Sequence, residues 1–350
     1  MTNKHERVVI FCQAPSDIPF FLALYEKFKA SKTIVVYVIN VYNNYKFLES
    51  LNLDLGGLFF IPYEYASLSK PWTLFKERKR ISSLNAKHFL SLKDATVYFC
   101  SCFEDWLTAY FVSSLAKNNN VYYLGNYDFI EGDYSERKSL NFRRFLLKSV
   151  YLFLTGINFK VEIVEKIPEF PYQKFRIEKA DLKVDNSIFV KYGLKLSDSF
   201  NNKPVALFFV TPCQGNIFCE ESYDINQLKV IKFLKSCGWC IIVKGHPRLG
   251  IPENILSLVD LEIPQHIPAE FIQNDNISIC LGIVTTAIVS FAKGTNIPTY
   301  SLINLFEFVE SSLPDQFKDY LAGYSDNKVK YFSDFEQFNE VIVNYDQKKD

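Results

Sequence analysis

The chain has 350 residues, of which 48% are apolar, enough for two domains of about 150 residues each. Lysine plus arginine and aspartate plus glutamate both number 39, so the formal net charge is zero. This balance excludes the strongly basic surface that is typical of nucleic-acid-binding proteins. We therefore expect no nucleic-acid partner, and a local cluster of residues must hold any anionic ligand.

The N-terminus and the cysteines both favour a cytoplasmic protein. Residues 1–7 lack the apolar core of a signal peptide, and the apolar run at 8–11 is too short to span a bilayer. Most of the eight cysteines lie in apolar runs, as reduced buried thiols do. Cys237 and Cys240 form a CxxC pair, but the pair runs into a strand, and no second pair lies at zinc spacing.

Residues 1–160 alternate short apolar runs with helical patterns and are expected to form an N-terminal Rossmann-like domain. Repeated strand–helix units predict a parallel sheet with helices on both faces. The expected strands are 8–11, 33–39, 58–61, 95–100 and 121–124, and the expected helices start near Asp17, cover 72–92 and end near Ala116.

Residues 143–154 are basic at one end and apolar and aromatic beyond it. This pattern is typical of an interfacial helix that lies on an anionic bilayer. A buried helix with a solvated basic start would show the same pattern. The segment therefore leaves peripheral contact with a membrane open.

Prolines and polar turn residues interrupt any long periodicity in 161–203, which is expected to be the linker region. The alternation then returns, so 204–330 is expected to form a second Rossmann-like domain, followed by a C-terminal helix within 331–350. The expected fold class is α/β, with two doubly wound sheets that leave a cleft between them. The strands of the second domain are predicted at 205–210, 239–243, 259–261, 277–281 and 297–303, with helices at 225–236, from Pro268, and at 285–292.

His246 directly follows an apolar strand pattern that ends at Gly245. Ligands of open α/β sheets bind beyond the carboxyl ends of strands, and histidine exchanges protons near neutral pH. Lys244 and Arg248 flank the histidine, and Pro247 stiffens its backbone. A structural histidine is the alternative interpretation, but the position favours contact with a ligand.

Two further sites follow predicted strands of the second domain. Glu270 lies in the first helical turn after Pro268, where the helix dipole favours a carboxylate and where a ribose diol could donate to it. Thr285 and Thr286 open the next helix after Gly282. Hydroxyls and backbone N–H groups at a helix N-terminus bind phosphate, although threonine is also a plain N-cap.

Three carboxylates, Asp128, Glu131 and Asp133, follow the last strand of the first half, beside Gly132. A carboxylate that faces a cleft can act as general base on an acceptor hydroxyl. An ordinary acidic turn is the alternative, because aspartate and glycine are common turn residues.

The order of these motifs resembles that of bacterial sialyltransferases and polysialyltransferases, including glycosyltransferase family 52, and of related capsule Kdo transferases. The shared order is an acidic residue before glycine, then His-Pro, Pro-x-Glu and a hydroxyl pair. The resemblance implies the GT-B fold, with an acceptor domain at 1–160 and a CMP-sugar donor domain at 204–330. The chain departs from the pattern at Ile130, where the family has the first of two acidic residues.

The resemblance also implies roles for residues in the donor domain. His246 with Pro247 contacts the donor phosphate and assists the departure of CMP. Glu270 binds the ribose, and Thr285 with Thr286 binds the phosphate.

On the same resemblance the catalytic base is Glu131, with Asp128 and Asp133 as rivals. Lys244 and Arg248 steer the phosphate or the sugar carboxylate. No metal is implied, because one phosphate needs no divalent ion and the sequence has no Asp-x-Asp in a suitable loop. No cofactor is implied beyond the donor itself.

The implied activity is an inverting glycosyltransferase. It moves a nonulosonic acid, sialic acid by default, from a CMP-sugar to a glycan acceptor of bacterial lipooligosaccharide or capsule, at the inner face of the membrane. Gly215 and Asn216, in the loop after the strand at 205–210, are expected to contact the donor. One alternative is a GT-B enzyme that uses a nucleotide diphosphate sugar, although this loop is small for a diphosphate. The other is a non-catalytic GT-B-like subunit, which Ile130 favours.

Overall fold

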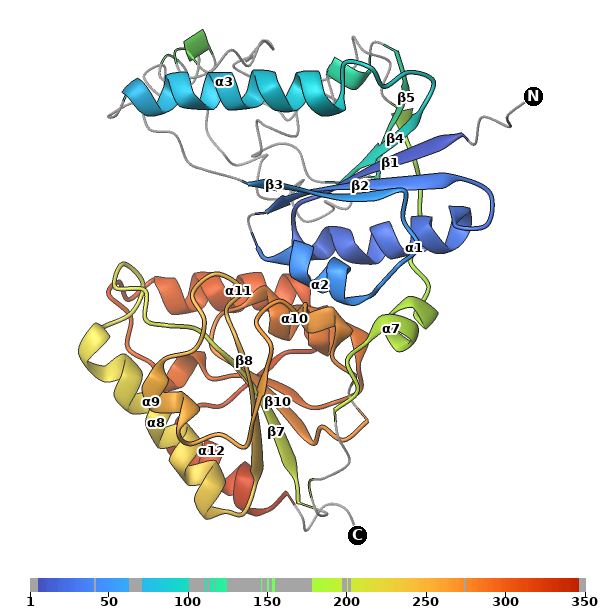
Figure 1. Ribbon diagram of the computed structural model, residues 1–350. Coiled ribbons are helices and arrows are strands. Elements are labelled where there is room, and N and C mark those ends of the chain that lie inside the picture. Colours follow the sequence, from blue (N-terminus) through green and yellow to red (C-terminus); the bar gives the residue numbers. More distant parts are fainter. Residues whose placement is uncertain are drawn as a thin grey trace. The chain divides into compact units, whose positions relative to one another are not determined.

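The structure, a computed structural model, divides the chain into two units, Met1–Ile188 and Phe189–Asp350, each with its own sheet (Figure 1). The division falls inside the segment 161–203. The carboxylate candidates Asp128, Glu131 and Asp133 lie outside the residues that the structure describes. The structure describes residues 6–40, 42–62, 71–100, 111, 114–116, 118–124, 146, 150, 153–154, 178–196, 200, 203–273 and 275–345.

The sheet of the first unit is entirely parallel among the described residues, in the order β3-β2-β1-β4-β5-β6. The central strand is apolar and buried from Val8 to Cys12, because helices cover both faces of the sheet. The strands are β1 (Arg7–Cys12), β2 (Thr33–Asn40), β3 (Gly57–Pro62), β4 (Thr96–Phe99), β5 (Asn120–Tyr123) and β6 (Glu178–Lys179).

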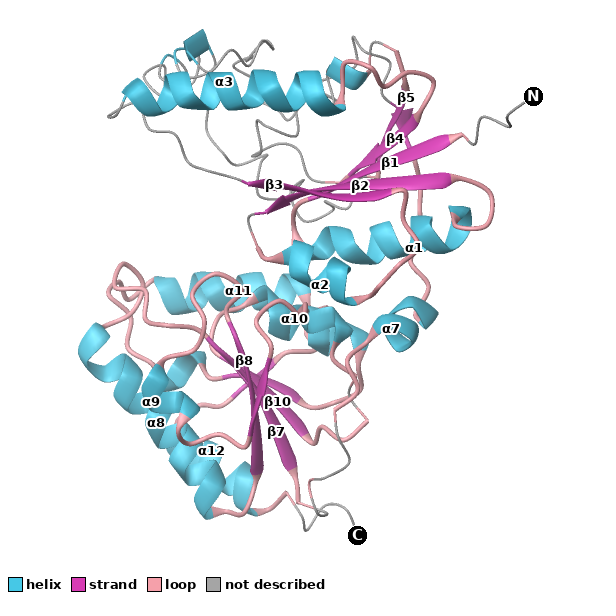
Figure 2. Cartoon of the chain, viewed as in Figure 1, coloured by secondary structure: helices cyan, strands magenta, loops and turns pink. Residues whose placement is uncertain are grey.

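The two faces of this sheet are covered by different helices (Figure 2). One face carries α1 (Ile18–Phe28), which follows the 3₁₀ turn η1 (Pro15–Asp17), and α2 (Asn44–Ser50). The other carries α3 (Pro71–His88). Ile81 of α3 packs into one buried cluster with Val9 and Phe11 of β1. These contacts pack the buried side of α3 against the sheet.

The second unit repeats the same topology. Its parallel sheet has the order β12-β11-β10-β7-β8-β9, so the first strand of the unit, β7, is central. This is a doubly wound sheet, and its strand order reverses between β7 and β10. The strands are β7 (Val205–Val210), β8 (Cys240–Gly245), β9 (Leu261–Ile263), β10 (Ile279–Gly282), β11 (Thr299–Ser301) and β12 (Lys330–Tyr331).

The helices of the second unit separate these strands. α7 (Ser187–Tyr192) crosses the division between the units. The others are α8 (Glu220–Ser236), α9 (Glu253–Leu256), η3 (Ala269–Phe271), α10 (Thr286–Gly294), η4 (Ile303–Leu305), α11 (Leu313–Tyr324) and α12 (Phe335–Val343). None of the described helices in the chain is both long enough and apolar enough to cross a bilayer.

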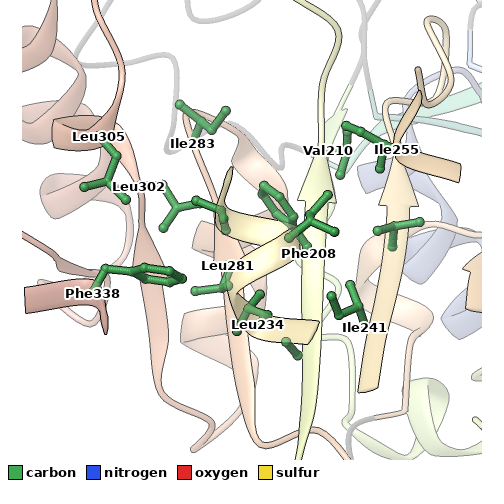
Figure 3. Close-up of a cluster of buried hydrophobic side chains, with 14 of the residues drawn as sticks. Phe208, Val210, Leu234, Ile241, Ile255, Leu281, Ile283, Leu302, Leu305 and Phe338 are labelled. Carbon is green, nitrogen blue, oxygen red and sulfur yellow. The ribbon is translucent and has the colours of Figure 1, made fainter. Parts of the chain in front are cut away.

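The core of the second unit lies between its central strands and the helices that cover them (Figure 3). Phe208 of β7 and Leu281 of β10 contribute to a fully buried cluster that also contains Leu234 of α8 and Phe338 of α12. Burial of each such side chain is worth about 1.5–3 kcal/mol. The strand ends that carry the candidate site therefore project from a rigid base.

Candidate functional site

The described candidate residues lie in loops at one edge of the second sheet. The loops follow β7, β8, β9 and β10, and all of these strands are parallel. The edge is the carboxyl edge, where doubly wound sheets bind their ligands, with the preferred crevice between β7 and β10. Chain topology alone brings these loops together.

His246 sits in a tight turn directly after β8. Its carbonyl accepts a hydrogen bond from the Gly250 N–H at 2.9 Å, and Gly250 adopts a left-handed backbone with φ of 74°. The turn also requires Gly245, because a Cβ there would lie 2.8 Å from the Gly250 carbonyl oxygen. Two glycines therefore fix the backbone that carries the imidazole.

The imidazole of His246 is oriented by its own turn. Its Nδ1 accepts hydrogen bonds from the backbone N–H groups of Arg248 at 3.2 Å and Leu249 at 3.3 Å. Burial lowers the pKa of His246, and the positive charges of Arg248 and Lys244 lower it further. The neutral ring therefore predominates at neutral pH with its proton on Nε2, so His246 presents an N–H donor to a ligand.

Lys244 is buried, with 3% of its surface exposed. Its Nζ donates to the carbonyls of Gly245 and Gln265, both at 3.0 Å. Burial lowers the pKa of Lys244 to about 8, with partial compensation from the carboxylates of Glu270 and Glu262. The contact with a donor that the sequence predicts for Lys244 stays a prediction, because the contacts present give it a positioning role.

Gln265 is a residue of the site that sequence reasoning did not single out. Its side-chain amide donates to the carbonyls of His246 at 3.2 Å and Pro247 at 2.8 Å. The end of β8 and the segment after β9 are thus linked by two sets of hydrogen bonds. Lys244 donates to the Gln265 carbonyl, and the Gln265 side chain donates back to the turn after β8. No local pattern marks this glutamine, since its partners are backbone groups far away in sequence.

Glu270 lies in η3 and connects this segment to α10. Burial raises the pKa of the Glu270 carboxyl, while hydrogen bonds from its own N–H and the Ser290 hydroxyl, and the charge of Lys244, oppose the shift. A carboxylate has lone pairs for more acceptors than these. Glu270 can therefore still accept from a ribose hydroxyl, as predicted, but its first structural task is to hold η3 against α10.

Thr285 is the N-cap of α10. Its backbone is extended, with φ of −153°, and its hydroxyl accepts from the Ala287 N–H at 3.2 Å. Thr286 is exposed and begins the helix. Gly282 lets Ile288 of α10 pack closely against the end of β10, because a Cβ at residue 282 would lie 2.5 Å from Cγ2 of Ile288. The other N–H groups of the first turn have no intrahelical acceptor, and such groups favour an anion at a helix N-terminus.

The loop after β7 is an unfavourable place for phosphate. The Gln214 carbonyl accepts from the N–H groups of Ile217 and Phe218, which closes the loop into a turn. The carboxylate of Glu220 lies directly against Gly215. A negative charge there disfavours direct contact of a phosphate group with this loop. The predicted contact of Gly215 and Asn216 with the donor is therefore more favourable for hydroxyl groups than for phosphate.

The second unit thus holds most of the predicted site at one sheet edge. His246, Pro247 and Arg248 lie at the end of β8, with Arg248 exposed, and Thr285 and Thr286 lie at the start of α10. Among the described residues, no group of three or more histidines, cysteines or carboxylates could hold a metal ion. The site as described offers hydrogen-bond donors and one helix N-terminus.

Comparison with known proteins shows the fold. No family model matches the chain, and no curated protein matches it. The glycotransferase of kitacinnamycin aligns with a TM-score of 0.50 and 8% identity, over 98% of this chain and 91% of that one. UGT89C1 of Arabidopsis thaliana, solved in complex with UDP, aligns with a TM-score of 0.50 and 10% identity, over 98% of this chain and 90% of that one.

These likenesses, together with the two doubly wound sheets, show that the chain has the two-domain α/β fold of GT-B glycosyltransferases. The predicted fold class is confirmed. The narrower likeness to glycosyltransferase family 52 and to CMP-sugar enzymes stays a prediction.

Proposed function

We propose that the protein is a glycosyltransferase that takes its sugar from a nucleotide donor bound to the second unit. One observation carries the proposal: the Nε2–H side of His246 and the N-terminus of α10 flank β7 at the carboxyl edge of a single sheet. Both groups donate hydrogen bonds, and neither is paired with a carboxylate in the described contacts. Such a pair suits the phosphate of a departing nucleotide.

The reaction follows from these positions. The bond between the anomeric carbon and the donor phosphate oxygen breaks, and its electron pair stays on the phosphate. A bond forms from an acceptor hydroxyl oxygen to the anomeric carbon, and the hydroxyl proton goes to a carboxylate, for which Glu131 remains the predicted base. His246 and the first turn of α10 stabilise the growing phosphate charge.

A nucleoside diphosphate sugar is the favoured donor. β8 and β10 lie on opposite sides of β7, so their ends are two strand spacings, or about 10 Å, apart. Two linked phosphates span this separation more readily than one. The likeness to UGT89C1, which was solved with UDP, supports the same donor class.

A CMP-nonulosonate is the second candidate. The order of the His-Pro, Pro-x-Glu and Thr-Thr motifs favours it, and Glu220 beside Gly215 limits the room for a second phosphate near β7. Transfer to a glycan acceptor is proposed for both donors.

Thermal-shift titration with UDP, GDP, CDP and CMP tests the donor class. We expect a diphosphate to raise the melting temperature most, because ligands that bind only the folded state stabilise it by mass action. The largest shift with CMP would transfer the assignment to CMP-sugars. No shift with any nucleotide would contradict the proposal.

The role of His246 is tested by turnover of the donor that responds best. His246→Ala is expected to lower kcat by about a hundredfold or more while the melting temperature without ligand changes little. Turnover of Glu131→Ala, measured in parallel, tests whether Glu131 is the catalytic base. Wild-type protein that binds the nucleotide but neither transfers nor hydrolyses the sugar would favour the non-catalytic alternative.

A further inference from the structure

The outward side of α3 combines aromatic and basic side chains. Trp72 and Phe75 have exposed fractions of 79% and 48%. Lys76, Lys79 and Lys87 are also exposed. At 100° per residue these five positions fall within about a third of the helix circumference. We call these five residues the α3 stripe.

The α3 stripe contains no acidic residue. The one carboxylate of the helix, Glu77, is buried on the opposite side and pairs with Arg80. Arg80 in turn donates to the Pro62 carbonyl at 2.6 Å. The only negative charge of α3 is thus turned inward and neutralised, which leaves the outward side with three positive charges.

A second exposed apolar row occurs in the same unit. Leu146, Val150 and Phe153 are helical and have exposed fractions of 52%, 41% and 78%. Spacings of four and three residues place them on one face of a helix. The sequence between and before them supplies Arg143, Arg144 and Lys148. Exposed apolar side chains thus occur in a second place in the first unit.

We propose that the α3 stripe docks on the surface of an anionic phospholipid bilayer. Aromatic side chains favour the interface between headgroups and acyl chains, and neighbouring lysines are drawn to negative headgroups. A second copy of the chain fits less well. In a symmetric dimer the same surface meets itself, and three lysines would face three lysines with no acidic partner.

Docking is measured by co-sedimentation of the full-length protein with vesicles of phosphatidylcholine, with and without phosphatidylglycerol. We expect binding to the vesicles that contain phosphatidylglycerol, and weaker binding at high salt. Lys76→Gln combined with Lys79→Gln should weaken binding by about 25-fold, since each lysine near such a surface is worth about 1 kcal/mol. Trp72→Ser combined with Phe75→Ser should weaken it by about tenfold or more.

The matched control lies on α8 of the second unit, where Ile225 is 64% exposed and Lys232 is also exposed. Ile225→Ser combined with Lys232→Gln should leave vesicle binding unchanged. Brominated lipids give a second measurement, because they should quench wild-type tryptophan fluorescence and quench Trp72→Phe markedly less.

Three results would overturn the proposal. The first is equal binding to both kinds of vesicle, or to neither. The second is binding that the α3 substitutions do not change although the variants melt like the wild type. The third is a dimer in light scattering that Trp72→Ser abolishes, because that result would assign the surface to a second copy. None of these measurements depends on the identity of the sugar donor.

Discussion

Lys244 is a charged side chain placed where charge is costly. Its ammonium group is buried at the end of a strand, and two backbone carbonyls accept its hydrogen bonds. Glu270 and Glu262 offset only part of the desolvation, so the pKa still falls to about 8. Such an arrangement stabilises the fold poorly, but it orients the loops on which His246 and Glu270 lie.

Replacing Lys244 with methionine should reveal this cost as a pH dependence. The unfolded chain keeps the proton up to about pH 10.5, whereas the folded protein loses it near pH 8. Between these values the unfolded state binds more protons, so wild-type stability rises with pH. Relative to Lys244→Met, the wild-type free energy of unfolding should rise by up to about 3 kcal/mol from pH 7 to pH 10.5.

Urea unfolding at a series of pH values measures this difference. Lys232→Met is the control, because it removes an exposed lysine and no buried charge. If the free energies of unfolding of the wild type and Lys244→Met differed by the same amount at every pH from 7 to 10.5, the burial argument would be contradicted.

At the residue scale, sequence reasoning reaches the residues that strand ends determine. His246 and Thr285 could be placed because an apolar β-branched run ends just before each of them, and the carboxyl ends of parallel strands meet at one edge. Gln265 could not be found this way, since its role depends on backbone carbonyls 18 and 19 residues away in sequence. The local sequence pattern also does not predict that the Lys244 side chain is buried.

At the element scale, α10 is the helix whose start matters most for the proposed phosphate site. Gly282 ends β10, and Thr285 caps the helix after only a short connection. The Ile288 side chain fills the space above Gly282 and is fully buried. A β-branched side chain in a helix has one preferred rotamer, so it cannot easily move aside.

Gly282→Ala should therefore shift the start of α10 and weaken nucleotide binding. We expect a loss of about 1–3 kcal/mol in stability from overpacking, together with a smaller nucleotide-induced thermal shift. Gly294→Ala, at the other end of the same helix, meets no atom within 4 Å. That variant should be up to about 1 kcal/mol more stable, with unchanged binding. Unfolding curves and titrations that are alike for the two variants would contradict this account.

The elements themselves were predictable where one strong pattern defines them. β7 was predicted with its observed bounds because every residue of Val205–Val210 is apolar and the strand is buried on both faces. α11 was missed although its pattern is helical, because the apolar and aromatic residues Leu313, Phe317, Leu321 and Tyr324 recur at spacings of three and four. The helix predicted at 285–292 continues two residues further, because α10 ends at Gly294.

At the scale of the whole molecule, two similar sheets have different surroundings. Each unit has its own buried core, and the same strand order occurs in both. The described donor-binding candidates all lie in the second unit, whereas the exposed aromatic and basic residues of α3 lie in the first. Binding of a nucleotide and docking on a membrane are therefore expected to be separate properties of separate units.

Hydrogen exchange measured by mass spectrometry tests this separation. Saturation with the nucleotide that gives the largest thermal shift should slow exchange in the turn at 246–250 and in the first turns of α10, because the ligand contacts the His246 side chain and the start of α10 and so stabilises both elements. The central strands β1 and β2 should exchange at unchanged rates. Anionic vesicles should instead protect α3 and leave α10 as it was. Protection of β1 and β2 by the nucleotide, with none at α10, would place the donor in the first unit and reverse the assignment of the two units.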